Sequence, residues 1–213
     1  KPAQKETQMA KPGLYAREAA VSLLHGVLLE KRLLIDLVHG EDSALLDLEP
    51  SERARAQSLA MTTLRNLGPI DVVLNTFLTQ KTPFALLNIL RVAATEILVD
   101  CLAGHAAVGA AATMAKRRQK TSHLKNVANA VLRKVAVEGR VIFADLPPQE
   151  LPKAFRSQMA KIATKDEIVA IERAHQMGAP VDLTSKDADA APVLAKTLGG
   201  ELLPNGSIRL ARA

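Results

Sequence analysis

The stretch "KNVANAVLRKV", Lys125–Val135, decides how the helical part of this sequence is interpreted. At about 100° per residue of an α-helix, its polar and apolar side chains fall on opposite faces. The polar face carries Asn126, Asn129 and Arg133, and the last two are spaced to hydrogen-bond along the helix. The apolar face consists of Leu124, Val127, Ala128, Val131, Leu132 and Val135. Because asparagine is a mediocre helix former, the polar face is either ordinary solvated surface or a surface with a partner.

The composition of the whole chain favours a mainly α fold. Of 213 residues, 48% are hydrophobic but only 2% are aromatic, so the core must consist of Leu, Val, Ile and Ala. The single cysteine, Cys101, excludes an internal disulfide and a cysteine-based zinc site, and it fits a cytoplasmic setting. It falls on an apolar helical stripe, where we expect a buried thiol. The five histidines show no ligand spacing, and we expect no metal.

Apolar spacing and turn residues divide the chain into a helical domain and a smaller α/β segment. Residues 1–12 read as a flexible tail, and residues 13–140 as a helical domain. The proline-rich residues 141–150 read as a linker, and residues 151–213 as the beginning of an α/β subdomain, truncated at its end. Helices are predicted over about 16–28, 33–38, 50–67, 70–78, 83–101, 105–118, 122–137, 153–162, 165–177 and 187–198. "PVDLTS" reads as a strand, and "ELLPNGSIRLA" reads as a hairpin around its Asn-Gly turn.

Positive charge is concentrated in one part of the chain. The formal net charge is +6, yet the segment from Lys116 to Arg140 holds eight basic residues and one acid, Glu138, for a local net charge of +7. The eight are Lys116, Arg117, Arg118, Lys120, Lys125, Arg133, Lys134 and Arg140. A local basic cluster of this kind indicates a polyanion as partner.

The position of these cations relative to the helix ends is informative. Cations that end one helix suit its dipole and need no functional explanation. Lys120, His123 and Lys125, however, lie at the beginning of the next helix, with Thr121 or Ser122 as its cap. Cations are unfavourable there unless an anion is bound, so we expect contacts to RNA phosphates. With so few aromatic residues, no base-stacking platform is expected, and the contacts should be mainly electrostatic.

Three stretches, "LRVAATEIL", "HAAVGAAATMAKRRQK" and "NVANAVLRKV", resemble the NusB-like helical domain over about residues 13–138. In that family a basic loop at a helix end precedes the Asn-Ala-Val-Leu-Arg signature, which stands here at Asn129–Arg133. "YAREAAVSLL" is similar to the family's first helix, with Arg17 at its basic position. The charge pattern and the resemblance together predict an RNA-binding site made of Arg17, Lys116, Arg117, Arg118, Lys120, His123, Lys125, Asn126 and Arg133.

The rest of the chain resembles a larger protein. "LPKAFRSQMAK", "AIERAHQMGAPVDLTSK" and "LPNGSIRLA" are similar to the segment that follows the NusB-like domain in bacterial RsmB (Fmu/Sun) ribosomal RNA cytosine-5 methyltransferases, although "VDLTSK" replaces the usual Leu-Arg-x-Asn. The resemblance implies a parent enzyme that acts on 16S rRNA with S-adenosylmethionine and two cysteines. This chain has neither a glycine-rich cofactor loop nor a cysteine pair. We therefore expect no cofactor and no catalysis here, and a methyltransferase domain downstream in cis.

The expected function is that of a non-catalytic region which holds ribosomal RNA during rRNA processing. One alternative is a NusB-type transcription antitermination factor with RNA and a protein partner, against which the long extension beyond residue 140 argues. Another is a helical protein-interaction adaptor without RNA, against which the local charge argues. No membrane association is expected, because the longest uncharged apolar run, Cys101–Ala115, is shorter than the roughly 18–20 residues that span a bilayer.

Overall fold

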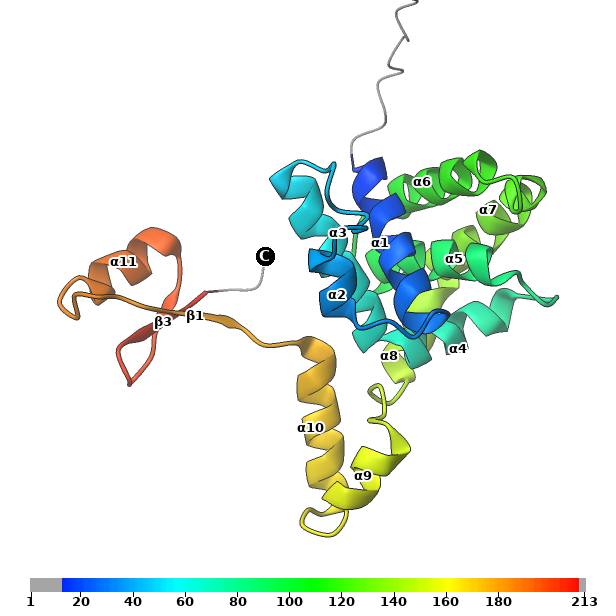
Figure 1. Cartoon of the computed structure of the whole chain (residues 1–213). Helices are drawn as coiled ribbons and strands as arrows, with labels where there is room; N and C mark the ends of the chain where they lie inside the picture. The colour runs from blue at the N-terminus through cyan, green and yellow to red at the C-terminus, as the bar shows by residue number, and fades with distance from the viewer. Residues whose placement is uncertain (1–12, 211–213) are drawn as a thin grey trace, which may run out of the picture. The chain divides into compact units, whose positions relative to one another are not determined.

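The computed structural model describes residues 13–210, so the predicted flexible tail, residues 1–12, lies outside the described residues. The chain forms two compact units, of which the first ends at Gln176 and the second begins at Met177. The first unit is helical, and the second combines one helix with a small sheet (Figure 1). The predicted mainly α fold with a smaller α/β segment is therefore confirmed. The boundary between the units lies well beyond the predicted boundary at residue 151.

Most helices of the first unit follow the apolar periodicity of the sequence. Their bounds are α1 Leu14–Leu28, α2 Leu34–His39, α3 Pro50–Arg65, α4 Leu67–Phe77, α5 Phe84–Leu98, α6 Gly104–Arg117, α7 Lys125–Lys134, α8 Arg140–Asp145, α9 Lys153–Met159 and α10 Lys165–Met177. The break predicted at Gly68-Pro69 occurs at Asn66 instead, because Pro69 is tolerated in the first turn of α4. Within residues 13–210, each helix is too short or too polar to cross a lipid bilayer.

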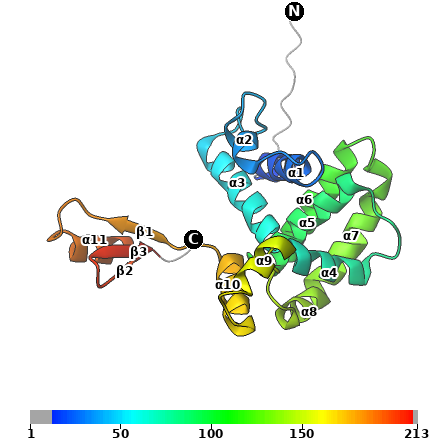
Figure 2. The same ribbon diagram turned by 60° about the horizontal axis from the view of Figure 1, so that its bottom comes forward.

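Helix α5 lies at the centre of the first unit, where it packs against α1, α3, α4, α6 and α7 (Figures 1 and 2). Its residues from Asn88 to Leu98 are all buried, as expected for a helix with neighbours on every side. Helix α6 contributes small buried side chains, among them Ala107, Ala111 and Ala115. The alanine-rich sequence therefore allows α6 to lie close to α5 and α7, its main neighbours.

The helix predicted over 122–137 is more irregular than its sequence suggests. It begins with the 3₁₀ turn η1, Ser122–Leu124, continues as α7, and widens into the π-helical turn η2, Val135–Gly139, before α8. Gly139 allows this close packing, because a Cβ atom there would lie 3.1 Å from Val73 Cγ1 and 3.3 Å from Leu98 Cδ2. Helix α8 also corrects the predicted linker, since residues 141–145 are helical.

The expected burial of Cys101 is wrong. Helix α5 ends at Leu98, so Cys101 lies in the connection to α6 with an exposed side chain. The backbone of Cys101 has a φ of 54°, in the left-handed region, so it is not α-helical. The apolar face of α5 therefore stops before Cys101.

The second unit has the elements that its sequence predicts. Strands β1 Val181–Thr184, β2 Glu201–Leu202 and β3 Ser207–Leu210 form an antiparallel sheet in the order β1-β3-β2. Helix α11, Ala191–Leu198, ends at Gly199, whose φ of 64° suits glycine. Ala191, Ala195 and Ile208 are the buried residues of its core.

Candidate nucleic-acid interface

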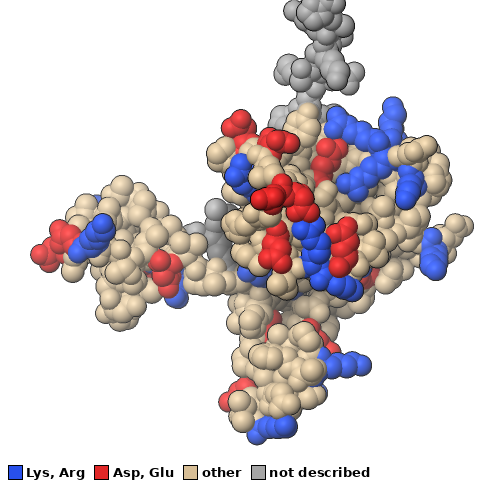
Figure 3. Space-filling model, in the orientation of Figure 1, with Lys and Arg blue, Asp and Glu red and all other residues tan. Residues whose placement is uncertain are grey.

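The predicted basic cluster lies at the turn between α6 and α7. Figure 3 shows Lys and Arg side chains gathered over these two helices at the upper right of the molecule. Lys116, Arg117, Lys120 and His123 are exposed, and Arg118 and Lys125 are partly exposed. The structure therefore brings together six of the nine predicted residues within one short part of the chain.

The turn is held by Thr121, whose side chain is buried. Its hydroxyl donates a 2.9 Å hydrogen bond to the carbonyl oxygen of Ala115, near the end of α6. Thr121 occupies the N-cap position of η1, as predicted, but its side chain forms no capping hydrogen bond. Ser122 Oγ likewise donates backwards, to the Gln119 carbonyl at 3.2 Å. Both hydroxyls therefore stabilise the chain reversal rather than the helix that follows.

The beginning of η1 and α7 is consequently left without a side-chain cap. Neither element has a capping side chain or an acidic residue in its first turn. The positive end of the helix dipole thus faces solvent next to Lys120, His123 and Lys125. These three side chains form no hydrogen bond or ion pair within residues 13–210. The arrangement is suited to an anion, and no acidic group of the first turn competes for it.

Arg117 differs from its neighbours because it is tied to α1. Its Nη1 lies 3.2 Å from Glu18 Oε1, and both side chains are partly exposed. The pair joins the end of α6 to the first helix, so it places the basic cluster beside the outer face of α1. An exposed pair of this kind adds little stability, and Arg117 keeps donors for an external anion.

Arg17 does not belong to this surface, which corrects its prediction as an RNA-binding residue. Only 8% of Arg17 is exposed. Its Nε and Nη2 atoms donate to Glu96 Oε2 and Oε1 at 2.7 and 2.8 Å, and Glu96 is fully buried. Arg55 donates to the same carboxylate at 2.6 Å from the solvent side. Arg17 is therefore the buried partner of a structural ion pair between α1 and α5.

The remaining predicted residues are exposed but spread along α7. Asn126 lies in its first turn, whereas Arg133 lies eight residues after Lys125, or about 12 Å along the helix axis. Arg133 is thus separated from the cluster at the α6–α7 turn. Asn129 and Arg133 form no hydrogen bond with each other. Val127, assigned to the apolar face, is 42% exposed, so that face is narrower than predicted.

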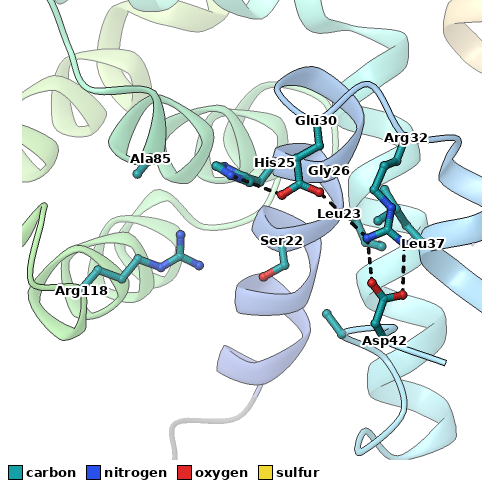
Figure 4. Close-up of a pocket in the computed structure, with 11 residues that line it drawn as sticks. Ser22, Leu23, His25, Gly26, Glu30, Arg32, Leu37, Asp42, Ala85 and Arg118 are labelled. Carbon is teal, nitrogen blue, oxygen red and sulfur yellow. Dashed lines mark hydrogen bonds and ion pairs between the residues drawn. The ribbon is translucent and has the colours of Figure 1, made fainter. Parts of the chain in front are cut away.

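A groove along α1, which the sequence interpretation missed, begins beside this cluster. It consists of two adjoining hollows of about 400 and 360 Å³ that share Ser22, Ala44 and Arg118. The smaller contains Tyr15 and Glu18, and the larger contains His25, Glu30, Arg32 and Asp42. Figure 4 shows Arg118 pointing into the larger hollow from the side opposite Glu30 and Arg32. Tyr15, Glu18, Ser22 and His25 are three or four residues apart, a helical spacing that could have revealed this face.

Three acids, Glu18, Glu30 and Asp42, and two cations, Arg32 and Arg118, line the groove. The Arg32 guanidinium donates two hydrogen bonds to Asp42, at 2.8 and 3.0 Å, and holds the pKa of that carboxyl below its ordinary value. Glu18 is paired with Arg117. Among the described residues, no group of three or more His, Cys, Asp or Glu side chains lies together in a way that could hold a metal ion.

The fold and the basic surface agree with a comparison against protein families. The NusB family matches residues 15–137, more than half of the chain, and the protein belongs to that family. Membership points to RNA binding or to a role related to antitermination. The match ends within the π-helical turn, so α8 to α11 and the sheet lie beyond it. No curated protein matches the chain.

Proposed function

We propose that this chain is the non-catalytic RNA-binding region of a ribosomal RNA cytosine-5 methyltransferase and that it holds 16S rRNA in the cytoplasm. The observation that carries the RNA-binding part is the uncapped beginning of η1 and α7, which has cations in place of acids. A helix end of this kind is stabilised by phosphate, because both the dipole and the side chains attract negative charge. Membership of the NusB family supports the same role.

The methyltransferase context is supported by the part of the chain that lies beyond the family match. Residues 138–210 contribute α8 to α11 and a three-stranded sheet, elements for which the NusB match does not account. The order of strand, helix and hairpin is the one expected from the resemblance to RsmB-type enzymes. The coding sequence after Ala213 tests this part directly. A downstream domain with a cofactor loop and two catalytic cysteines is the expected result, and a stop codon at that point would contradict it.

The first prediction concerns the basic turn. Replacing Lys120 and Lys125 together by alanine should weaken the binding of a single-stranded rRNA fragment. Each phosphate contact that is lost lowers the slope of log K against log salt by about 0.7, so the slope should fall by about one to one and a half units. Folding should persist, because both side chains lack intramolecular partners and oppose the helix dipole. The measurement is fluorescence anisotropy of labelled RNA in a series of salt concentrations.

The matched control is the replacement of Lys153 and Lys165 by alanine. These lysines are exposed on α9 and α10, so the net charge changes equally while the α6–α7 turn stays intact. Their loss should leave the salt slope unchanged within error. Equal effects of both double variants would mean that net charge alone acts, and the proposed phosphate site would be wrong.

A second prediction concerns S-adenosylmethionine, which the residues of the second unit do not fit. The connection from β1 to α11, residues 185–190, is "SKDADA" and contains no glycine for a close approach of the cofactor. Gly200 follows a helix and serves packing, since a Cβ there would lie 2.7 Å from Ile208 Cγ2. Titration calorimetry of the chain with S-adenosylmethionine should give no binding heat. Micromolar affinity would contradict the non-catalytic assignment.

A further inference from the structure

We propose that the groove along α1 holds an unpaired two-nucleotide segment of RNA, with one base stacked on Tyr15, the phosphate on Arg118 and the next base beside Glu30. This inference rests on the proposed RNA-binding function and adds a subsite for bases to the phosphate contacts of the α6–α7 turn. It differs from the expectation drawn from composition alone, which was a surface without any stacking side chain.

Arg118 is the residue of the groove that favours an anion. It lines both hollows, and its guanidinium forms no hydrogen bond or ion pair within residues 13–210. Two of the three acids in the groove are paired, because Asp42 accepts from Arg32 and Glu18 is paired with Arg117, and the third, Glu30, lies across the larger hollow from Arg118. A phosphodiester at the junction of the two hollows would therefore meet one free cation. Arg118 also follows Lys116 and Arg117 in sequence, so a strand bound at the basic turn can continue into the groove.

Tyr15 gives the smaller hollow a face for stacking. It is the only tyrosine of the chain, it is 48% exposed, and its side chain forms no hydrogen bond among the described residues. An aromatic ring that projects from a helix beside a cation is the combination by which proteins bind single strands. Stacking accepts any base, which suits a site that follows a phosphate backbone.

The larger hollow can hold the second base. Its volume of about 400 Å³ lies in the range of small-molecule sites. His25 closes one side, with its ring 5.9 Å from that of Phe84. The Glu30 carboxylate lies 3.7 Å from His25 Nε2 and 3.9 Å from Arg32 Nη1, which are ion-pair distances but not hydrogen bonds. Its oxygens are therefore free to accept an N–H group of a base, as carboxylates do in base recognition.

The test uses the fluorescence of the protein itself. The chain has one tyrosine and no tryptophan, so Tyr15 dominates its near-ultraviolet emission. An eight-nucleotide oligouridylate, which stays unpaired, should quench this emission as it binds, and free tyrosinamide corrects for absorption by the RNA. Duplex RNA of the same length should bind the basic turn but quench little, because its bases are already stacked.

Three variants separate stacking from charge. Tyr15→Ala should weaken binding of the labelled oligouridylate about tenfold with an unchanged salt slope, and Tyr15→Phe should bind like the wild type. Arg118→Ala should lower the salt slope by about 0.7. Because Tyr15 is exposed, its replacement should leave the fold intact. Circular dichroism of each variant checks this.

The outcomes also separate this inference from the proposed function. Binding without quenching, or a Tyr15→Ala variant that binds like the wild type, would overturn the groove proposal and leave the phosphate site standing. Equal quenching by duplex RNA would overturn it as well. No RNA binding by the wild-type chain at all would remove both proposals together.

Discussion

Replacement of Glu96 by alanine is expected to lower the free energy of unfolding by about 3–5 kcal/mol. Glu96 is fully buried and accepts hydrogen bonds from Arg17 at 2.7 and 2.8 Å. Arg17 is itself only 8% exposed, so its guanidinium would remain in the core without a counter-charge. Urea unfolding followed by far-ultraviolet circular dichroism measures the loss.

Arg55 supplies the control for this prediction. It donates to the same carboxylate, but its side chain is 41% exposed, so water replaces the lost contact. Arg55→Ala should therefore cost less than about 1 kcal/mol. Replacing Arg17 by methionine and Glu96 by leucine together should recover much of the loss, since neither charge is then buried alone. A Glu96→Ala variant as stable as Arg55→Ala would show that the buried pair does not hold α1 against α5.

The second large effect is expected at Leu132, in the middle of the stretch "KNVANAVLRKV". Leu132 is fully buried on the core face of α7. Leu132→Ala removes buried methyl groups and leaves a cavity, so the free energy of unfolding should fall by about 2–5 kcal/mol. The same urea experiment measures it, and an unchanged slope with denaturant would indicate that the native fold persists.

Asn129 is the matched position on the other side of the same helix. It is partly exposed, and its side chain forms no hydrogen bond within residues 13–210. Asn129→Ala should therefore stabilise the chain by about half a kcal/mol through helix propensity alone. A loss of about 1 kcal/mol would instead indicate a structural hydrogen bond. Of the cations in this stretch, Lys125 lies where the helix begins, and Arg133 and Lys134 lie in its last turn.

The helices could be predicted because their signal is local. An apolar residue every three or four positions located α1, α5 and α6 to within a few residues, and Asn205-Gly206 marked the hairpin of the second unit. Helix ends depend on finer interactions. The direction in which the hydroxyls of Thr121 and Ser122 donate is decided by the path of the chain reversal, which periodicity does not describe.

Contacts between distant residues could not be predicted in this way. Arg17 and Glu96 are separated by 79 positions, and charge and spacing alone do not distinguish a buried arginine from one that binds RNA. The exposure of the cations at the α6–α7 turn was predictable, because several charged side chains close together at a helix end are almost never buried. The groove was not, since α1, the loop after it and Arg118 form it only when packed.

The π-helical turn Val135–Gly139 has a consequence for sequence alignment. Its hydrogen bonds span five residues instead of four, so it contains one residue more than an α-helical turn. Loss of a residue between Ala136 and Glu138 would convert it into an ordinary turn and keep α7 and α8 in register. The same deletion inside α7 would rotate every later side chain by about 100°. A one-residue gap between this chain and a relative therefore belongs at 136–138.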